Sequence, residues 1–166
     1  MVGTLEPRKG HSLVLDRFEE LWDAGSPARL IIAGRAPWPP LLARIRAHEE
    51  LGDRLLYRDD VADRELAALY RGAVATISAS AGEGFGLPVV ESLSLGTPVI
   101  ASDIPAHREV GGAHCRFFPP GDAPGLSAAL REALAGALPR PAGFRWPDWE
   151  ESGRELSAAL RRLSSP

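Results

Sequence analysis

Short apolar runs alternate along this chain with stretches in which apolar residues recur at every third or fourth position. The short runs have the character of buried strands, whereas the periodic stretches indicate amphipathic helices. Residues 1–4 have the pattern of a strand end whose beginning is missing. We expect complete strands at residues 30–33, 74–77 and 98–101, and weaker strand candidates at residues 55–57 and 115–118.

The periodic stretches each lead into a glycine, the residue that best adopts the left-handed conformation found at helix ends. This arrangement predicts a series of helices between the strands. The helical faces, each with its closing glycine, are Val14, Phe18, Leu21 and Trp22 before Gly25; Leu42, Ile45 and His48 before Gly52; Leu66, Leu69 and Tyr70 before Gly72; residues 89–95 before Gly96; and Leu126, Leu130 and Leu134 before Gly136.

Strands that alternate with helices imply a parallel sheet with helices on both faces. Because crossovers in such sheets are right-handed, the expected fold class is α/β, with a doubly wound, Rossmann-like arrangement. Ligands of these folds bind beyond the carboxyl ends of the strands. Two candidate motifs lie there: Arg8-Lys9 after the first strand, and the glycine-rich segment 82–91 after the strand at 74–77.

A proline- and glycine-broken connection at residues 138–147 separates this fold from a last helix. We therefore expect a ligand-binding domain at residues 1–145 and a C-terminal helix at residues 146–166. The helix carries an apolar stripe that needs something to cover it, either this domain or a partner. The stripe consists of Trp149, Gly153, Leu156, Leu160 and Leu163.

Composition narrows the classes of function. With 166 residues the chain is large enough for one domain with a real core. Its net charge of -3 argues weakly against nucleic acid or an anionic membrane as the main partner. A single cysteine, Cys115, excludes a disulfide framework and a cysteine-rich metal site. No run is long enough to span a bilayer and no signal-peptide pattern is present, so we expect a cytoplasmic protein.

The segment 82–91, Gly-Glu-Gly-Phe-Gly-Leu-Pro-Val-Val-Glu, is the most informative part of the chain. Its glycines let the backbone approach a ligand, and Pro88 suits the first turn of a helix. A helix N-terminus attracts phosphate. Glu83 would repel an anion, but a carboxylate accepts hydrogen bonds from sugar hydroxyls. The combination indicates a ligand that carries both phosphate and sugar.

The basic residues are lopsided, since Lys9 is the only lysine among 19 Lys and Arg residues. Its compact ammonium suits a phosphate, although a surface lysine after a turn is the ordinary alternative. Arg35 follows a strand end and either contacts phosphate or base or is simply exposed. The chain has no Asn and no Gln, so any base recognition must use backbone groups, Arg, Asp, Glu, Ser or Thr.

Other polar residues have plain structural explanations. Glu91 could be an acid favoured by the helix dipole, and Glu83 could be a solvated loop acid. We assign Asp103 to capping or another structural role and the lone His107 to the surface or to packing.

Three segments together resemble the family 4 retaining glycosyltransferases of the GT-B fold, in particular their C-terminal, nucleotide-sugar-binding half. Paired glutamates with seven residues between them are a weak signal alone. Inside Gly-Phe-Gly-Leu-Pro, and together with the Arg-Lys turn, they are specific. The resemblance covers nearly the whole chain and is carried by residues 2–10 (VGTLEPRKG), 83–91 (EGFGLPVVE) and 95–105 (LGTPVIASDIP).

The resemblance implies a role for each matching residue. Lys9 would hold the donor diphosphate with Arg8 nearby, and Glu83 would accept hydrogen bonds from donor-sugar hydroxyls, so these three form the predicted catalytic group. Glu91 would accept from the ribose. The predicted donor-binding residues are Gly3, Thr4, Gly34, Arg35, Val61, Gly84, Phe85, Gly86, Leu87 and Glu91.

Some of these roles belong to the backbone. The N–H groups of Phe85, Gly86 and Leu87 would contact sugar and phosphate, and the backbone of Val61 would contact the base. One departure from the family concerns Thr4, because many members have an arginine there as a second phosphate ligand. Arg8 either substitutes for it or the pocket is less positive.

The activity implied by the resemblance is transfer of a hexose from a nucleoside-diphosphate sugar to a saccharide or glycolipid acceptor. The turn Gly-Thr-Leu-Glu-Pro-Arg-Lys is typical of the mannosyltransferase-like branch, which favours GDP-mannose over a UDP-sugar as donor. Cations and a helix N-terminus can stabilise the leaving diphosphate, so we expect neither a metal nor another cofactor. The other partner would be the N-terminal acceptor domain, which this chain lacks. We therefore expect donor binding without turnover, with peripheral membrane contact left open for the full-length enzyme.

Two other functions compete with this interpretation. Gly82, Gly84 and Gly86 between two strands, with Asp103 about twenty residues later, are reminiscent of a dinucleotide-binding oxidoreductase. That fingerprint needs its last glycine at Leu87, however, and it tolerates Glu83 poorly beside a pyrophosphate. The second alternative is a non-catalytic module that binds a nucleotide-sugar, because its pocket would look the same.

Overall fold

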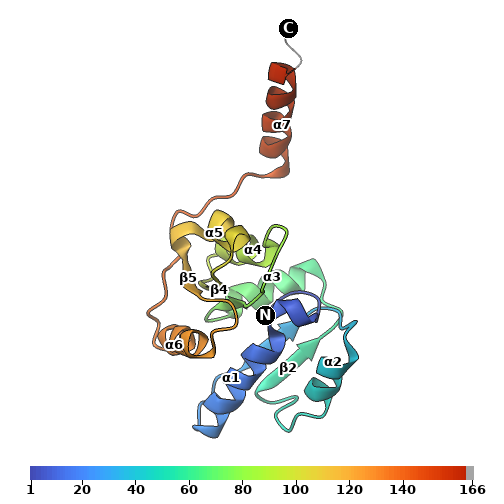
Figure 1. The fold of residues 1–166 in the computed structure, drawn as a ribbon, viewed down its shortest axis with the longest axis vertical. Helices are drawn as coiled ribbons and strands as arrows, with labels where there is room; N and C mark the ends of the chain where they lie inside the picture. The colour runs from blue at the N-terminus through green and yellow to red at the C-terminus, as the bar shows by residue number, and fades with distance from the viewer. Residues whose placement is uncertain (164–166) are drawn as a thin grey trace.

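The computed structural model describes residues 1–163 and shows an α/β body from which one helix extends (Figure 1). Strands and helices alternate along the chain, as the apolar pattern predicts. The helices are α1 (His11–Asp23), α2 (Pro39–Arg46), α3 (Asp63–Gly72), α4 (Leu87–Ser94), α5 (Pro105–Gly111), α6 (Ala123–Leu134) and α7 (Trp149–Leu163), with the 3-10 helices η1 (Pro7–Lys9) and η2 (Gly112–His114).

The paired strands are all parallel, but they form two sheets instead of one continuous sheet. In the first sheet β1 pairs with β2, and in the second β4 lies between β3 and β5. The beginning of the chain contributes only an isolated parallel bridge between Val2 and Ala33. The strands are β1 (Leu30–Ala33), β2 (Leu55–Arg58), β3 (Thr76–Ser78), β4 (Val99–Ser102) and β5 (Cys115–Phe118).

Each face of the second sheet has its own apolar core, which confirms the predicted helices on both faces. Neighbouring residues of β4 point to opposite sides. Ile100 belongs to the larger cluster, which includes side chains of α1, α2 and α6. Val99 and Ala101 belong to a smaller cluster with Val89 of α4 and Val110 of α5. In Figure 1 α4 and α5 accordingly lie together, away from α1.

Several predicted boundaries shift for identifiable reasons. β3 begins at Thr76, two residues later than predicted, because the ladder starts where the Thr76 N–H donates to the Pro98 carbonyl. The second helix ends at Arg46, so the predicted His48 lies beyond it. Gly72 is the last residue of α3 and not a cap beyond it. The short helix α5 was not predicted, because Pro105 and two glycines mask its periodicity.

Helix α7 stands apart from the body in Figure 1, and none of its described residues is buried. The connection that leads to it packs more closely, since Phe144 and Trp146 lie against the smaller core cluster. The apolar stripe predicted for this helix is therefore largely uncovered, with Trp149 90% exposed. The predicted C-terminal segment extends to residue 166, and its last three residues lie outside the described range. No helix within residues 1–163 is long and apolar enough to cross a membrane.

Candidate functional site

Two turns meet beyond the carboxyl ends of the strands. One is η1, which follows the Val2 bridge, and the other is the segment after β3. The Ala81 N–H donates to the Arg8 carbonyl at 2.7 Å and so ties the turns together. Their backbones approach so closely that a Cβ on Gly10 would lie 2.3 Å from the Ala79 carbonyl oxygen. Gly10 also has a φ of 72°, so both space and backbone conformation require glycine here.

At this crossing Lys9 and Glu83, which are far apart in the sequence, form an ion pair. Lys9 Nζ donates to Glu83 Oε1 at 2.5 Å and to Oε2 at 2.7 Å. The Ser80 hydroxyl donates to the same carboxylate at 2.6 Å. The Lys9 and Glu83 side chains are only 15% and 9% exposed. The structure thus brings together two of the three predicted catalytic residues as a partly desolvated ion pair.

Arg8, the third member, lies beside this pair and is more exposed. Its Nη1 donates to the Gly82 carbonyl at 3.1 Å and lies 3.5 Å from Glu83 Oε2. Its Nε donates to Glu6 Oε2 at 2.8 Å, and the side chain is 51% exposed. Arg8 therefore holds the glycine-rich turn through a hydrogen bond, while about half of its side chain remains exposed to solvent.

The charge state of Glu83 follows from its neighbours. Burial alone would raise the pKa of this carboxyl group. Hydrogen bonds from Lys9 and Ser80, with the charges of Lys9 and Arg8, outweigh burial and hold the pKa of Glu83 below its ordinary value. The carboxylate is therefore ionised at neutral pH and can accept hydrogen bonds from hydroxyl donors. An anion that binds Lys9 must share that ammonium with Glu83.

The glycine-rich turn ends at the N-terminus of α4. Within residues 1–163, the Val89 and Val90 N–H groups both donate to the Gly86 carbonyl, at 2.9 and 3.4 Å. No hydrogen bond found in that range uses the N–H groups of residues 85–87. Phe85 and Leu87 are 41% and 58% exposed, whereas Gly86 between them is buried. Free N–H groups at a helix N-terminus are donors for an anionic or hydroxylated ligand.

A buried histidine packs against this turn. His107 of α5 is fully buried, and its Cδ2 would lie 3.3 Å from a Cβ on Gly86. Its Nε2 is 3.1 Å from Ser78 Oγ, and its Nδ1 is 2.9 Å from the Ser102 carbonyl oxygen. Burial lowers the pKa of this imidazole. Of the two roles predicted for His107, surface or packing, the structure shows the second, with hydrogen bonds to the ends of β3 and β4.

Glu91 is positioned by Tyr70, which the sequence pattern predicts only as part of a helical face. The Tyr70 hydroxyl donates to Glu91 Oε2 at 2.8 Å, and Tyr70 is 3% exposed. Burial, together with the Glu91 charge, raises the pKa of Tyr70 above its ordinary value. The hydroxyl therefore keeps its proton and holds one oxygen of the Glu91 carboxylate in place.

A second crossing arranges the remaining predicted residues. The Leu5 N–H donates to the Arg35 carbonyl at 2.8 Å, and a Cβ on Gly34 would lie 2.1 Å from the Gly3 carbonyl oxygen. This contact places Thr4 and Arg35 side by side at the carboxyl ends of the first segment and β1. Val61 lies in the turn between β2 and α3, and no contact found in residues 1–163 joins it to the Lys9–Glu83 pair. Its role remains a prediction.

The alternative role of Asp103 as a ribose-binding acid is weakened by its partner. Arg108 Nε and Nη2 donate to the two Asp103 oxygens at 2.6 and 2.7 Å. This two-point contact uses both oxygens of the carboxylate. Residues 1–163 also contain no group of three or more His, Cys, Asp or Glu arranged to hold a metal ion.

The structure combines a parallel α/β fold with a paired lysine and glutamate beyond the carboxyl ends of its strands. Comparison with known families identifies the class of such domains to which it belongs. The model described as "Glycosyl transferases group 1" matches residues 1–142, and the chain belongs to that family. These findings support glycosyl transfer, and none of them favours the oxidoreductase alternative.

Curated relatives include mannosyltransferases. The serotype-specific mannosyltransferase WbdA of Escherichia coli is 40% identical over 163 residues, which cover 94% of this chain and 20% of WbdA. The O-antigen chain mannosyltransferase RfbU of Salmonella typhimurium is 32% identical over 142 residues, covering 84% of this chain and 39% of RfbU. The chain thus spans well under half the length of these relatives.

Solved structures show the same fold. Sucrose-phosphate synthase from Thermosynechococcus elongatus has a TM-score of 0.75 at 26% identity, covering 98% of this chain and 45% of that one. The catalytic domain of starch synthase IV from Arabidopsis thaliana has a TM-score of 0.77 at 16% identity, covering 97% of this chain and 37% of that one. These GT-B neighbours confirm the predicted Rossmann-like fold class.

Proposed function

We propose that this chain is the donor-binding half of a retaining glycosyltransferase that moves a hexose from a nucleoside-diphosphate sugar to a saccharide or glycolipid acceptor. The observation that carries the proposal is the Lys9–Glu83 pair beside the free N–H groups of the α4 N-terminus. A cation and N–H donors suit a diphosphate, while a carboxylate held ionised suits sugar hydroxyls. One site would therefore bind both the diphosphate and the sugar of the donor.

The chemistry follows from where charge develops. Breaking the bond between the sugar and the diphosphate leaves negative charge on the diphosphate oxygens. Lys9 and the N–H groups of residues 85–87 would stabilise that charge, with Arg8 beside Lys9 and Glu83. Glu83 accepts from sugar hydroxyls and Glu91 accepts from the ribose. This arrangement supplies the stabilisation with protein groups alone, so we expect donor binding to be insensitive to EDTA.

Mannose is the favoured sugar and GDP-mannose the favoured donor, with a UDP-sugar as the alternative. The curated relatives named above are mannosyltransferases, which supports this choice. The acceptor would bind on a separate N-terminal domain, as the greater length of the relatives suggests. We expect the present chain to bind donor without turnover, because cleft closure requires both domains. A cytoplasmic location remains part of the proposal.

The test is calorimetric titration of the chain with GDP, UDP, GDP-mannose, UDP-glucose and NAD, repeated on Glu91→Ala. We expect one nucleotide-sugar to bind and the variant to lose about tenfold in affinity, as a lost hydrogen bond to a charged group implies. Glu132→Ala is the matched control, because it also removes a glutamate, which pairs with Arg116 of β5 and lies in α6. Binding of NAD in preference to every sugar nucleotide would contradict the proposal. Binding without transfer, even after addition of an acceptor-binding domain, would favour a non-catalytic module.

A further inference from the structure

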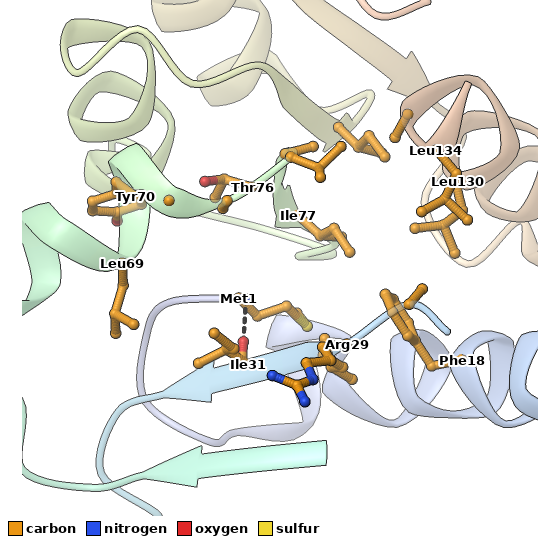
Figure 2. A pocket seen from close by; sticks show the side chains of 18 of the residues that line it. Met1, Phe18, Arg29, Ile31, Leu69, Tyr70, Thr76, Ile77, Leu130 and Leu134 are labelled. Carbon is orange, nitrogen blue, oxygen red and sulfur yellow. Dashed lines mark hydrogen bonds between the residues drawn. The ribbon is translucent and has the colours of Figure 1, made fainter. Parts of the chain in front are cut away.

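Three serines lie behind the candidate site, where strands β3 and β4 end. Neighbouring residues of β3 point to opposite faces of the sheet. Figure 2 shows Ile77 on the wall of an apolar groove of about 450 Å³, whereas the next residue, Ser78, reaches the other face and contacts His107 of α5. The other two are Ser80, which follows β3, and Ser102, the last residue of β4. The proposed function assigns no role to their hydroxyl groups.

The three serines and the histidine are shielded from water. All four side chains are buried, those of Ser102 and His107 completely. A buried polar group without a partner is costly, so hydroxyl groups and ring nitrogens in this region must bond one another or the backbone. Each of them has such a partner within residues 1–163, and the partners connect them to one another.

The geometry around His107 determines which ring nitrogen carries the proton. Nδ1 lies 2.9 Å from the Ser102 carbonyl oxygen, which can only accept, so Nδ1 must donate. Burial lowers the pKa of the imidazole, and the ring is therefore neutral at neutral pH, with a lone pair on Nε2. Nε2 lies 3.1 Å from Ser78 Oγ and accepts a hydrogen bond from that hydroxyl group.

The connection continues from Ser102 to the candidate site. The Ser102 hydroxyl donates to the Ser80 carbonyl oxygen at 2.5 Å, which leaves its oxygen able to accept from His107 Nδ1 at 3.2 Å. The Ser80 hydroxyl donates to Glu83 Oε1 at 2.6 Å. Every hydroxyl hydrogen in this series has an acceptor, and a fully satisfied buried network is rigid. The series, which we call the serine network, consists of Ser78, His107, Ser102, Ser80 and Glu83.

The serine network supplies an orientation that Lys9 alone does not. The Lys9 ammonium bonds both oxygens of Glu83, but it is carried by a flexible four-carbon side chain. The bond from Ser80 comes instead from a buried residue whose carbonyl group is held by Ser102. Lys9 therefore compensates the charge of Glu83, whereas the network fixes the direction of the carboxylate.

The imidazole of His107 also packs against the glycine-rich turn. A Cβ on Gly86 would lie 3.3 Å from His107 Cδ2, and Gly86 is the residue before α4, with a φ of 99°. One ring of α5 thus contacts the turn directly and is connected to the carboxylate of Glu83 through two serines.

We propose that His107 is a positioning residue for the sugar of the donor. Neutral, with its proton on Nδ1, it holds Ser102 and Ser80 so that the Glu83 carboxylate faces the sugar hydroxyls. This inference rests on the proposed function, because the contact between Glu83 and the sugar belongs to that proposal. His107 is fully buried and acts through the other residues. Loss of the network should therefore weaken binding of the sugar and spare binding of the nucleoside diphosphate.

Ser102→Ala is the mildest test, because it removes a single hydroxyl group from the network. Calorimetry compares the affinities for GDP-mannose and GDP, or for UDP-glucose and UDP if uridine is the base that binds. We expect the ratio of the two affinities to fall about fivefold, as loss of one hydrogen bond implies, with the affinity for the diphosphate within about twofold. Ser92→Ala is the matched control and should leave the ratio unchanged, since Ser92 is equally buried but bonds Thr76 and Thr97.

Two variants of His107 separate positioning from packing. The amide of His107→Asn can still donate towards the Ser102 carbonyl, whereas His107→Leu has no donor. We expect the leucine variant to lower the affinity ratio at least as much as Ser102→Ala, and the asparagine variant to restore part of it. Equal ratios in the two variants would mean that His107 acts by packing alone. If the leucine variant does not fold, NMR of the ring nitrogens in the unaltered chain decides, and a proton on Nε2 in place of Nδ1 would overturn the proposal.

A measurement without donor distinguishes this inference from the proposed function. NMR of the Glu83 carboxyl carbon follows its titration in the unaltered chain, Ser102→Ala and Ser92→Ala. The hydrogen bond from Ser80 lowers the pKa of Glu83, so Ser102→Ala should raise that pKa and Ser92→Ala should not. Donor binding with an unchanged ratio and an unchanged titration in Ser102→Ala would overturn this inference alone. Absence of binding by every nucleotide-sugar would overturn the proposed function and the sugar role of the network with it.

Discussion

Two regions of this molecule differ in how well their polar groups are matched. At the carboxyl ends of the strands, Lys9 and Ser80 both donate hydrogen bonds to the Glu83 carboxylate, and the pair Lys9–Glu83 joins two turns. Elsewhere an apolar groove of about 450 Å³ lies between β1 and β3, and the N-terminal amine, whose pKa is lowered to about 5 by burial, donates to the Ile31 carbonyl beside it (Figure 2). The geometry of the candidate site therefore depends on hydrogen bonds between two turns, whereas at the groove a polar amine lies beside apolar side chains.

The largest effect on the candidate site is expected from a side chain added where its two turns are in contact. Gly10→Ala places a methyl group 2.3 Å from the Ala79 carbonyl oxygen at a residue with a φ of 72°. We expect the free energy of unfolding to fall by about 3 kcal/mol or more, with loss of donor binding. Thermal and denaturant unfolding measure the first effect and calorimetry the second.

Gly25→Ala is the matched control for that variant. Gly25 has a φ of 83°, but, its two chain neighbours aside, no heavy atom of residues 1–163 lies within 4 Å of the added Cβ. Its cost should be only that of the backbone conformation, about 1 kcal/mol. Equal losses in the two variants would show that backbone strain, and not the contact between the turns, governs Gly10.

Lys9→Met tests the charge of the same site without crowding it. The variant removes the cation that we assign to the diphosphate and leaves Glu83 with fewer partners. We expect the affinity for a nucleoside diphosphate to fall by about 30-fold, since hydrogen bonds to charged groups contribute about 1.5–3 kcal/mol. Arg46→Met removes an exposed cation elsewhere and should leave affinity unchanged. An equal loss in both variants would indicate general electrostatics and not a site.

Burial of the N-terminal amine should make the free energy of unfolding depend on pH. The N-terminal amine has a folded pKa of about 5 against 8.0 when free, so the unfolded chain binds more protons between these values. Stability should therefore rise as pH increases from 5 to 8, and the gain is lost as pH falls. We expect a change of about 2 kcal/mol over this window, a figure reduced for partial exposure of Met1. Denaturant unfolding at several pH values measures it.

Acetylation of Met1 provides the control, because it replaces the amine by a neutral amide. The acetylated chain should lose the dependence between pH 6.5 and 8. His11 contributes at lower pH, since burial first, then the charges of the N-terminus and Lys9, lower its pKa from 6.5 to about 4. Its contribution has the same sign between pH 4 and 6.5 and should persist in part after acetylation. Identical pH profiles for both chains would show that the amine does not reside in the groove.

The two regions of the molecule differ in how far the sequence predicts them. The strands at 30–33 and 115–118 were predicted well, because apolar runs are local signals, whereas the roles of Lys9 and Glu83 stay predictions. The split of the sheet was not predicted, since it depends on how far residues 1–4 can extend a ladder. Tyr70 and His107 were missed as supports for the site. Both look like packing residues in the sequence, and only the fold brings them to Glu91 and Gly86.

Tyr70→Phe measures how far such support matters to the site. The variant keeps the ring in the core but removes the hydrogen bond to Glu91 Oε2. We expect a fivefold loss of affinity for ribose-containing nucleotides, about 1 kcal/mol, and little change for inorganic diphosphate. Tyr57→Phe is the matched control, because its hydroxyl bonds the Gly34 carbonyl at 3.1 Å and not a carboxylate. Equal losses for nucleotide and diphosphate would mean that Tyr70 acts on overall stability.

The smallest effect is expected from removal of α7 by truncation after Pro147. None of its described residues is buried, so the helix adds little to the body, and the site lies elsewhere. The cut keeps Phe144 and Trp146, which pack against the smaller core cluster, and preserves the contact between Trp146 and Phe85, whose ring centroids are 5.4 Å apart. We expect a change in the free energy of unfolding of less than about 0.5 kcal/mol and unchanged nucleotide affinity. A large loss of stability or of nucleotide affinity would show that the body covers the apolar stripe of α7 in solution. The packing of α7 would then be a third region that contributes to stability, beside the two compared above.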